Sequence, residues 1–218
     1  FIASQWDAVL SDISIDALKT GMLWDKEVIK LISQKLRKKR IPIKVFDPVM
    51  FSKSGATLLS KEGQLAFVKE MLPLATIVTP NIPEAKMLCG QPIRTLKDME
   101  EAACRIYRLG AQSVLVKGGH RRGPAVDVLF DGRQIFHFSR PRIKTVHTHG
   151  TGCTFASAIA VELTRNGTLP EAVEKAKDFI TEAISHAFLL GKGNGPVNPY
   201  FPLGREAEIY RTIQALQE

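Results

Sequence analysis

Short β-type runs alternate with longer stretches of helical hydrophobic periodicity along most of the chain. In 25–40, for example, Val28 and Ile32 recur at helical spacing and give one apolar face. Gly90 is typical of a helix end, and Thr95 of a helix start. The pattern predicts strands at 16–21, 43–49, 76–80 and 113–119, and helices at 25–40, 61–72, 82–90, 95–110, about 153–166 and 170–190.

The segment 126–141 alternates in hydrophobicity around Asp131-Gly132, which predicts a β-hairpin. Strands separated by helices imply βαβ units, so we expect an α/β fold whose mostly parallel sheet is covered on both faces. At 218 residues the chain is long enough for one domain with a sizeable core. The Gly- and Pro-rich stretch 191–204 predicts a loop or linker, and the amphipathic stretch 205–218 predicts a docked helix or the entrance to a further domain.

The charge and cysteine content of the chain argue against some classes of partner and cellular compartment. The net charge of +8 indicates a basic surface or an anionic ligand, but the densest basic run, Arg37 to Arg40, ends a predicted helix. No nucleic-acid motif accompanies that run, so we expect no nucleic-acid partner. No apolar run is long enough to span a membrane, so we expect no membrane partner. Three cysteines without a C-x-x-C pair favour a reducing cytoplasm.

The stretch "HGTGC" at 149–153 is the chemically richest part of the chain. In a parallel sheet, ligands bind beyond the carboxyl ends of the strands, where helix starts offer unpaired N–H groups to phosphate. Gly150 and Gly152 let an anion approach the main chain, and Cys153 lies where the helix dipole favours a thiolate. A structural turn and an inert cysteine are the alternatives, because a G-T-G turn is a weak signal by itself.

Six segments together resemble a known family. The segments are "HGTGCTFASAIA" (149–160), "DALKTGML" (16–23), "DPVMFSKSG" (47–55), "TPNIPEAKMLCG" (79–90), "VLVKGGH" (114–120) and "GKGNGPVN" (191–198). In this order they resemble the hydroxymethylpyrimidine and phosphomethylpyrimidine kinases of thiamin biosynthesis, within the ribokinase superfamily. The resemblance implies a three-layer α/β/α ribokinase-like fold and a kinase domain at about 1–200.

The resemblance also implies roles for the residues around the glycine turn. Cys153 would be the base that takes the proton of the acceptor hydroxymethyl group, or would meet the acceptor phosphate in a second transfer. The backbone of Gly150, Thr151 and Gly152 would hold the charge of the transferred phosphoryl group. Lys117 would approach the ATP phosphates; the alternative for this residue is a strand-end lysine that reaches solvent.

A magnesium site is implied by the same family likeness. Asp47 and Glu84, with Asn81 nearby, would organise Mg²⁺ through carboxylate oxygens and water. Taken singly, Asp47 could simply precede a turn at Pro48, and Glu84 could simply favour the first turn of its helix.

Further residues would contact the two substrates. Met22 and Val49 would form apolar walls of the pyrimidine pocket, although each by itself is typical of a core position. Thr145 would contact the nucleotide. His147 and His149 flank the glycine turn and would shape it or cap a backbone group, with a general base as the alternative.

The implied activity is ATP-dependent phosphorylation of hydroxymethylpyrimidine and then of its monophosphate, with ATP and Mg²⁺ as cofactors. The implied partners are this small pyrimidine alcohol and its phosphate, and a second copy in a homodimer. Family members begin with a Gly-rich strand and loop that have no counterpart after Phe1, so we expect such a segment to precede it. A pyridoxal or pyridoxine kinase, a non-catalytic ligand-binding relative and a nucleic-acid binder are the alternatives.

Overall fold

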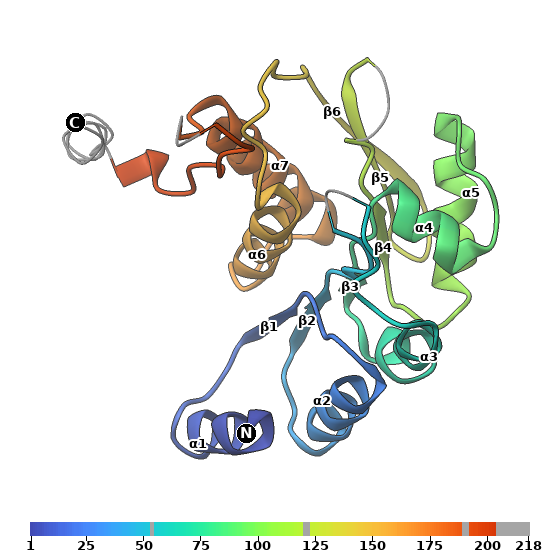
Figure 1. The fold of residues 1–218 in the computed structure, drawn as a ribbon, viewed down its shortest axis with the longest axis vertical. Coiled ribbons are helices and arrows are strands. Elements are labelled where there is room, and N and C mark those ends of the chain that lie inside the picture. Colours follow the sequence, from blue (N-terminus) through green and yellow to red (C-terminus); the bar gives the residue numbers. More distant parts are fainter. Residues whose placement is uncertain (53–54, 120–122, 189–191, 204–218) are drawn as a thin grey trace.

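The order of the strands in space equals their order in the chain. The computed structural model describes residues 1–52, 55–119, 123–188 and 192–203. Within these residues one six-stranded sheet has the order β1-β2-β3-β4-β5-β6, with β1 to β4 parallel and β4, β5 and β6 antiparallel (Figure 1). The strands are β1 Ala17–Thr20, β2 Ile43–Phe46, β3 Ile77–Val78, β4 Val114–Val116, β5 Ala125–Phe130 and β6 Ile135–Arg140.

Helices cover both faces of the sheet (Figure 1). Each of the parallel strands β1 to β4 lies next to the one before it, always on the same side. Because the connections between such strands are right-handed, the helices in these connections, α2, α3, α4 and α5, lie on the same face of the sheet. After the antiparallel hairpin β5–β6, the chain crosses to the opposite face of the sheet, which α6 and α7 cover. The helices are α1 Ile2–Asp12, α2 Lys26–Lys38, α3 Lys61–Ala66, α4 Ile82–Cys89, α5 Leu96–Tyr107, α6 Thr151–Leu163 and α7 Leu169–Ser185.

The sheet separates two hydrophobic clusters. Phe46 and Val78 belong to the cluster formed with α2 to α5, whereas their neighbours Val45 and Ile77 belong to the cluster formed with α6 and α7. Successive residues of a strand point to opposite faces, so each buried strand contributes to both clusters. The predicted three-layer α/β/α architecture with a mostly parallel sheet is therefore confirmed.

Several predicted boundaries are confirmed by local hydrogen bonds. Thr95 and Asp98 form a reciprocal capping box at the start of α5, and Gly90 ends α4 in the left-handed conformation with φ of 71°. The predicted hairpin forms between β5 and β6, and the Asp131 carboxylate accepts hydrogen bonds from the backbone of Arg133 and Gln134, each at 2.7 Å.

Helix α1 was not expected from the hydrophobic pattern. Leu10 is its buried residue, so the helix carries a weak apolar signal. Contacts with α2 hold it: Lys35 pairs with Asp7, and Lys39 Nζ donates to the Leu10 carbonyl at 3.0 Å. Its position therefore depends on tertiary contacts that the local sequence does not reveal.

The helix predicted at 61–72 is only partly α-helical. Regular α-helix ends at Ala66, a π-turn spans Phe67–Met71, and a 3₁₀ turn spans Leu72–Leu74. Pro73 explains the change, because proline has no N–H to donate and its ring clashes with the carbonyl four residues earlier.

The last two predicted helices are displaced at their ends. Helix α6 begins at Thr151, two residues before the predicted start, so Thr151 and Gly152 belong to its first turn. Helix α7 ends at Ser185 rather than at residue 190, because the Asn198 N–H caps the Ala183 carbonyl at 2.9 Å.

The tail of the chain agrees with the predicted loop only in part. A short 3₁₀ turn at Phe201–Leu203 lies inside the stretch predicted as a loop. The amphipathic stretch 205–218 lies outside the described residues. In the part of the chain that the structure describes, no helix has the length and apolar character needed to cross a membrane.

Candidate functional site

The carboxyl ends of the parallel strands gather polar residues at one edge of the sheet. Asp47 directly follows β2, Asn81 follows β3 by three residues, and Lys117 directly follows β4. Parallel strands end at the same edge, and helix α6, which packs against β1 and β2, starts at this edge too (Figure 1). These residues are far apart in the sequence, and the sheet brings them together.

A buried ion pair is at the centre of this edge. Lys117 Nζ lies 2.6 Å from Asp47 Oδ1, and their side chains are 12% and 3% exposed. The Thr79 hydroxyl donates to the same carboxylate oxygen at 3.3 Å. The Lys117 N–H donates to the Pro80 carbonyl at 2.8 Å, so β4 continues its pairing past its last ladder residue. Lys117 therefore turns inward to Asp47 and is not a solvent-exposed lysine.

Glu84 lies beside this pair. It forms a capping box with Asn81: Glu84 Oε2 accepts from the Asn81 N–H at 2.8 Å, and Asn81 Oδ1 accepts from the Glu84 N–H at 3.0 Å. Burial raises the pKa of Glu84 to about 7, and repulsion from Asp47 adds to the rise although Lys117 opposes it.

The charge of Lys117 is stabilised by its neighbours. Burial by itself would lower the pKa of Lys117, but attraction to Asp47 and Glu84 outweighs the burial cost and raises the pKa above its ordinary value. Lys117 therefore keeps its proton at neutral pH. One ammonium group faces two carboxyl groups in a partly dehydrated setting, so the cluster has no excess positive charge of its own.

Helix α6 points its first turn at this cluster. Gly150 is the residue before the helix and has φ of 82°, a left-handed conformation that favours glycine. The first bond of the helix ladder runs from the Thr154 N–H to the Gly150 carbonyl at 2.8 Å. The N–H groups of Gly152 and Cys153 thus have no helical partner and can bind an anion.

Gly152 makes the close approach that a phosphate site requires. A Cβ atom at this position would lie 3.3 Å from Lys117 Nζ and 3.8 Å from Asp47 Oδ2. Any side chain here would occupy the space between the helix start and the ion pair. The structure therefore brings together Gly152, Lys117 and Asp47, to which the family resemblance gave roles in phosphate and metal binding.

Cys153 has an exposed thiol in the same first turn of α6. The Thr151 hydroxyl donates to the Thr148 carbonyl at 2.8 Å, which ties the start of the helix to the preceding turn. A free, accessible thiol next to unpaired N–H groups is compatible with a role in chemistry and differs from the buried structural cysteine that was the alternative.

Residues 193–198 form hydrogen bonds with the turn before α6. The His149 N–H donates to the Gly195 carbonyl, and the His149 carbonyl accepts from the Val197 N–H, each at 3.1 Å. His147 Nδ1 accepts from the Gly195 N–H at 2.9 Å. The backbone of His149 and the ring of His147 thus connect the turn before α6 to residues 193–198.

Three further residues were predicted to contact the two substrates. Met22 follows the end of β1 and is 47% exposed, so it is not a core residue. Val49 is half-buried in the turn after Asp47, where its N–H donates to the Asp47 carbonyl at 2.9 Å. The Thr145 hydroxyl accepts from the His147 N–H at 3.1 Å.

A second buried ion pair was missed by the sequence analysis. Lys177 Nζ of α7 lies 2.6 Å from Asp127 Oδ2 of β5, and both side chains are buried. Two signals were available: Asp127 stands between two valines in a strand, and Lys177 occupies an apolar position of an amphipathic helix, four residues after Val173.

Comparison with known proteins places the chain among vitamin kinases. The sequence profile described as phosphomethylpyrimidine kinase matches residues 1–198. Thiamine biosynthesis bifunctional protein ThiED of Geobacter sulfurreducens is 52% identical over 91% of this chain and 41% of its own length. The hydroxymethylpyrimidine/phosphomethylpyrimidine kinase of Aquifex aeolicus is 42% identical over 88% of this chain and 76% of its own length. The chain thus spans less than half of the first relative and about three quarters of the second.

Solved structures agree with the sequence comparison. The ADP complex of Bacillus subtilis pyridoxal kinase has a TM-score of 0.85 at 39% identity and covers 91% of this chain and 76% of that chain. Phosphomethylpyrimidine kinase from Clostridium difficile 630 has a TM-score of 0.74 at 40% identity, with 84% and 75% covered. These matches confirm the ribokinase-like fold and the family resemblance. The chain belongs to the phosphomethylpyrimidine kinase family.

Proposed function

We propose that this chain is the kinase domain, at about 1–200, of an ATP-dependent enzyme that phosphorylates hydroxymethylpyrimidine and then its monophosphate. The observation that carries the proposal is the meeting of Lys117, Asp47 and the glycine at the start of α6. Phosphoryl transfer needs positioning and charge neutralisation more than covalent chemistry, and this cluster offers both. The names of the curated relatives support the pyrimidine substrate.

The start of α6 and Lys117 are proposed to bind the phosphates of ATP. The free N–H groups of Gly152 and Cys153 and the positive end of the helix dipole suit the γ-phosphate oxygens. Gly150 and Thr151 fix the turn that orients these groups. Lys117 Nζ adds a fixed positive charge on the other side of Gly152. Solved relatives in complex with ADP and AMP-PCP support nucleotide binding.

Cys153 Sγ is proposed to handle the proton of the acceptor. In the first transfer the hydroxyl oxygen attacks the γ-phosphorus and its proton moves to the thiolate form of Cys153 Sγ, which becomes a thiol, while ADP leaves with the electrons of the broken P–O bond. In the second transfer the acceptor is a phosphate monoester, which is largely dianionic above pH 7 because its second pKa is about 6. The second acceptor therefore needs little help from a base.

Magnesium fits the acidic part of the cluster. Asp47 and Glu84 carry hard oxygen donors, which are the ligands that Mg²⁺ prefers in proteins. Among the described residues no three His, Cys, Asp or Glu side chains gather into a closed metal cage. Mg²⁺ keeps several waters and needs only one or two carboxylates, so Asp47 and Glu84 would hold it, with Asn81 orienting Glu84. Bound Mg²⁺ would neutralise charge on the phosphates.

The remaining assignments are part of the same proposal. Met22 and Val49 would contact the pyrimidine ring, since both lie at the carboxyl ends of their strands with accessible surface. Thr145 would contact the nucleotide from the turn before α6. We further propose a homodimer in the cytoplasm without nucleic-acid partners; the three free cysteines suit a reducing compartment.

A pyridoxal kinase is the second candidate function. The TM-score with the Bacillus subtilis pyridoxal kinase is higher than that with the Clostridium difficile phosphomethylpyrimidine kinase, at nearly equal identity. Both activities place an aromatic alcohol against the same kind of phosphate site, so the acceptor pocket has to discriminate between them.

Turnover with both alcohols tests the proposed function. The complete protein, supplied with Mg²⁺ and ATP, is expected to convert hydroxymethylpyrimidine to its mono- and diphosphate with a higher kcat/KM than it shows for pyridoxal. Products can be resolved by mass spectrometry. A preference for pyridoxal would favour the second candidate, and no transfer to either alcohol would indicate a non-catalytic relative.

Replacement of the thiol tests the role of Cys153. Cys153→Ala is expected to lower kcat of the first transfer on the order of 100-fold, because a positioned base contributes about that much. The second transfer should fall much less, because its acceptor is already ionised at pH 8. Each step is measured separately from its own acceptor. Cys104→Ala, half-buried on α5, is the control and should leave both rates unchanged; equal losses in the two steps would contradict the assignment.

A methyl group at Gly152 should separate stability from activity. Gly152→Ala adds a Cβ about where Lys117 Nζ and an incoming phosphate approach, so kcat/KM for ATP should fall by roughly 10- to 100-fold. The melting temperature should not fall, because alanine favours a helix over glycine by about 1 kcal/mol. Gly167→Ala, before α7, meets only ordinary contacts and is the control. Unchanged ATP kinetics would contradict the phosphate site.

The pKa of Glu84 predicts a pH dependence of stability in metal-free protein. Its folded pKa is raised from 4.5 to about 7, so the native state binds more protons than the unfolded state between these values. The free energy of unfolding should therefore decrease as pH rises through this window, by about 3 kcal/mol in total.

Urea unfolding with a chelator present checks this slope. Glu84→Gln should remove the loss of stability between pH 4.5 and 7. Glu171→Gln is the matched control, because Glu171 is also the acidic residue of a capping box, at the start of α7, but its pKa is lowered. The control should keep the slope of the unaltered protein; identical slopes in all three proteins would contradict the raised pKa.

A further inference from the structure

The second buried ion pair, Asp127 with Lys177, has no part in the function proposed above. Asp127 lies on β5 and Lys177 on α7, and their side chains are 3% and 7% exposed. Each partner of this pair also contacts a segment that carries a residue of the phosphate site. Through these two contacts the ion pair connects the end of β4 to α6.

Asp127 holds the backbone directly after Lys117. Its Oδ1 accepts a hydrogen bond from the Gly118 N–H at 2.8 Å, while Oδ2 accepts from Lys177. The chain at Gly118 is pressed against β5, since a Cβ there would lie 1.8 Å from the Val126 carbonyl oxygen. The direction in which the chain leaves β4, and with it the position of Lys117, therefore depends on Asp127.

Lys177 contacts the helix that carries the other half of the phosphate site. Its Nζ lies 5.9 Å from the ring centroid of Phe155, within cation–π range. Phe155 is buried and comes two residues after Cys153 on α6. The pair thus links the end of β4 to the first turns of α6 through two buried contacts.

Stability by itself is a poor reason for this pair. Removing two charges from water costs free energy that their attraction often fails to recover, so apolar residues of similar volume would stabilise the core equally well. The link between α7 and the sheet is also made at the surface, where Arg140 of β6 pairs with Asp178 and Glu174. The buried pair provides directional bonds that an apolar contact cannot.

We propose that Asp127 and Lys177 are positioning residues that fix the position of Lys117 relative to the start of α6. They act through the hydrogen bond from the Gly118 N–H to Asp127. This inference rests on the proposed kinase function, in which Lys117 and Gly152 share one phosphate group. A shift of about 1 Å between these groups would cost up to roughly 100-fold in rate.

Two double variants of the complete protein distinguish a positioning role of the ion pair from an effect of its buried charges alone. Asp127→Asn/Lys177→Met and Asp127→Leu/Lys177→Met both lack both charges, and Asn and Leu are similar in size. Only Asn retains an oxygen that accepts from the Gly118 N–H. The measurements are kcat, KM for each substrate, and Kd for AMP-PCP, each normalised to the folded fraction well below the melting temperature.

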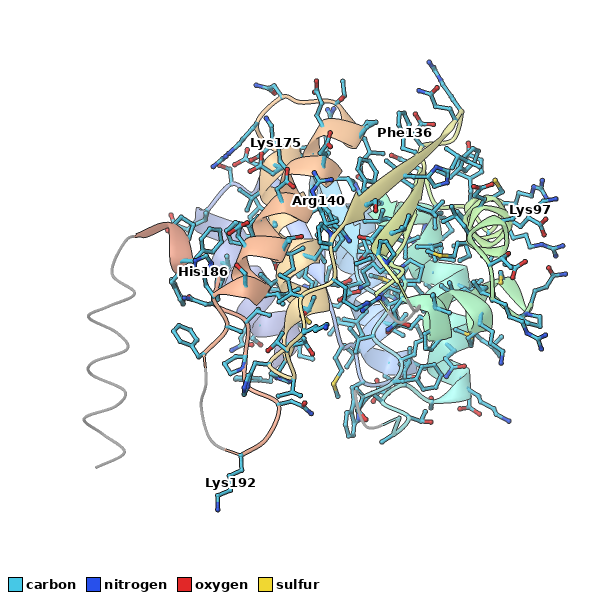
Figure 2. The ribbon with its side chains drawn as sticks, turned by 90° about the horizontal axis from the view of Figure 1, so that it is seen from above. Lys97, Phe136, Arg140, Lys175, His186 and Lys192 are labelled. Atoms are coloured by element: carbon cyan, nitrogen blue, oxygen red, sulfur yellow. The ribbon has the colours of Figure 1, made fainter. Side chains whose placement is uncertain are left out.

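The Asn variant is expected to keep kcat within about 3-fold of the unaltered protein, and the Leu variant to lose on the order of 10- to 100-fold. Lys177→Met alone should be less active than the Asn double variant, because it leaves Asp127 buried without a counter-ion. Lys175→Met is the matched control: this exposed lysine lies on the same helix (Figure 2) and its loss should change nothing. Equal kcat and equal Kd in the two double variants would overturn the proposal.

A measurement on the unaltered protein keeps the proposal testable if a variant fails to fold or if the protein phosphorylates no alcohol. Amide hydrogen exchange reports the Gly118 hydrogen bond without any activity. Protection of the Gly118 amide close to that of the β4 amides is expected, while the exposed Gly119 should exchange fast. Fast exchange at Gly118 would overturn the positioning role, whichever substrate the enzyme uses.

Discussion

The buried ion pair between Lys117 and Asp47 is the interaction on which the site depends. At 2.6 Å it joins the ends of β4 and β2 across the intervening strand, and it places the Lys117 ammonium group beside the start of α6. Burying these charges costs desolvation energy, which their attraction and the Thr79 hydrogen bond offset. Glu84 lies beside this pair, and burial raises its pKa to about 7 although Lys117 opposes the rise.

The architecture explains why these groups can meet. Four parallel strands end at one edge, so the residues that follow them converge although they are tens of positions apart in the sequence. Helix α6 buries apolar side chains against β1, β2 and α7, which places its first turn at this edge. Gly150 turns the chain into the helix, and the segment 193–198 holds that turn from outside.

Much of this could be predicted from local sequence. Hydrophobic periodicity predicted the layers, and the residues of the glycine turn indicated an anion site, because both signals are local. The site roles of Lys117 and Asp47 were implied by the family resemblance. Helix α1 was missed because one buried residue, Leu10, gives little periodicity. The Asp127–Lys177 pair was missed because its partners are 50 residues apart, and each by itself looks like a polar exception in a buried element.

The sequence by itself therefore determined the fold class, the family and the residue types at the site. These follow from periodicity, capping residues and motifs that act over a few positions of the chain. Tertiary structure alone decided which charges pair: Lys117 turns inward to Asp47, and Lys177 reaches Asp127 from another element. The physical reason is that pairing energy depends on distance and burial, which strand order and helix packing set, and which no short stretch of sequence encodes.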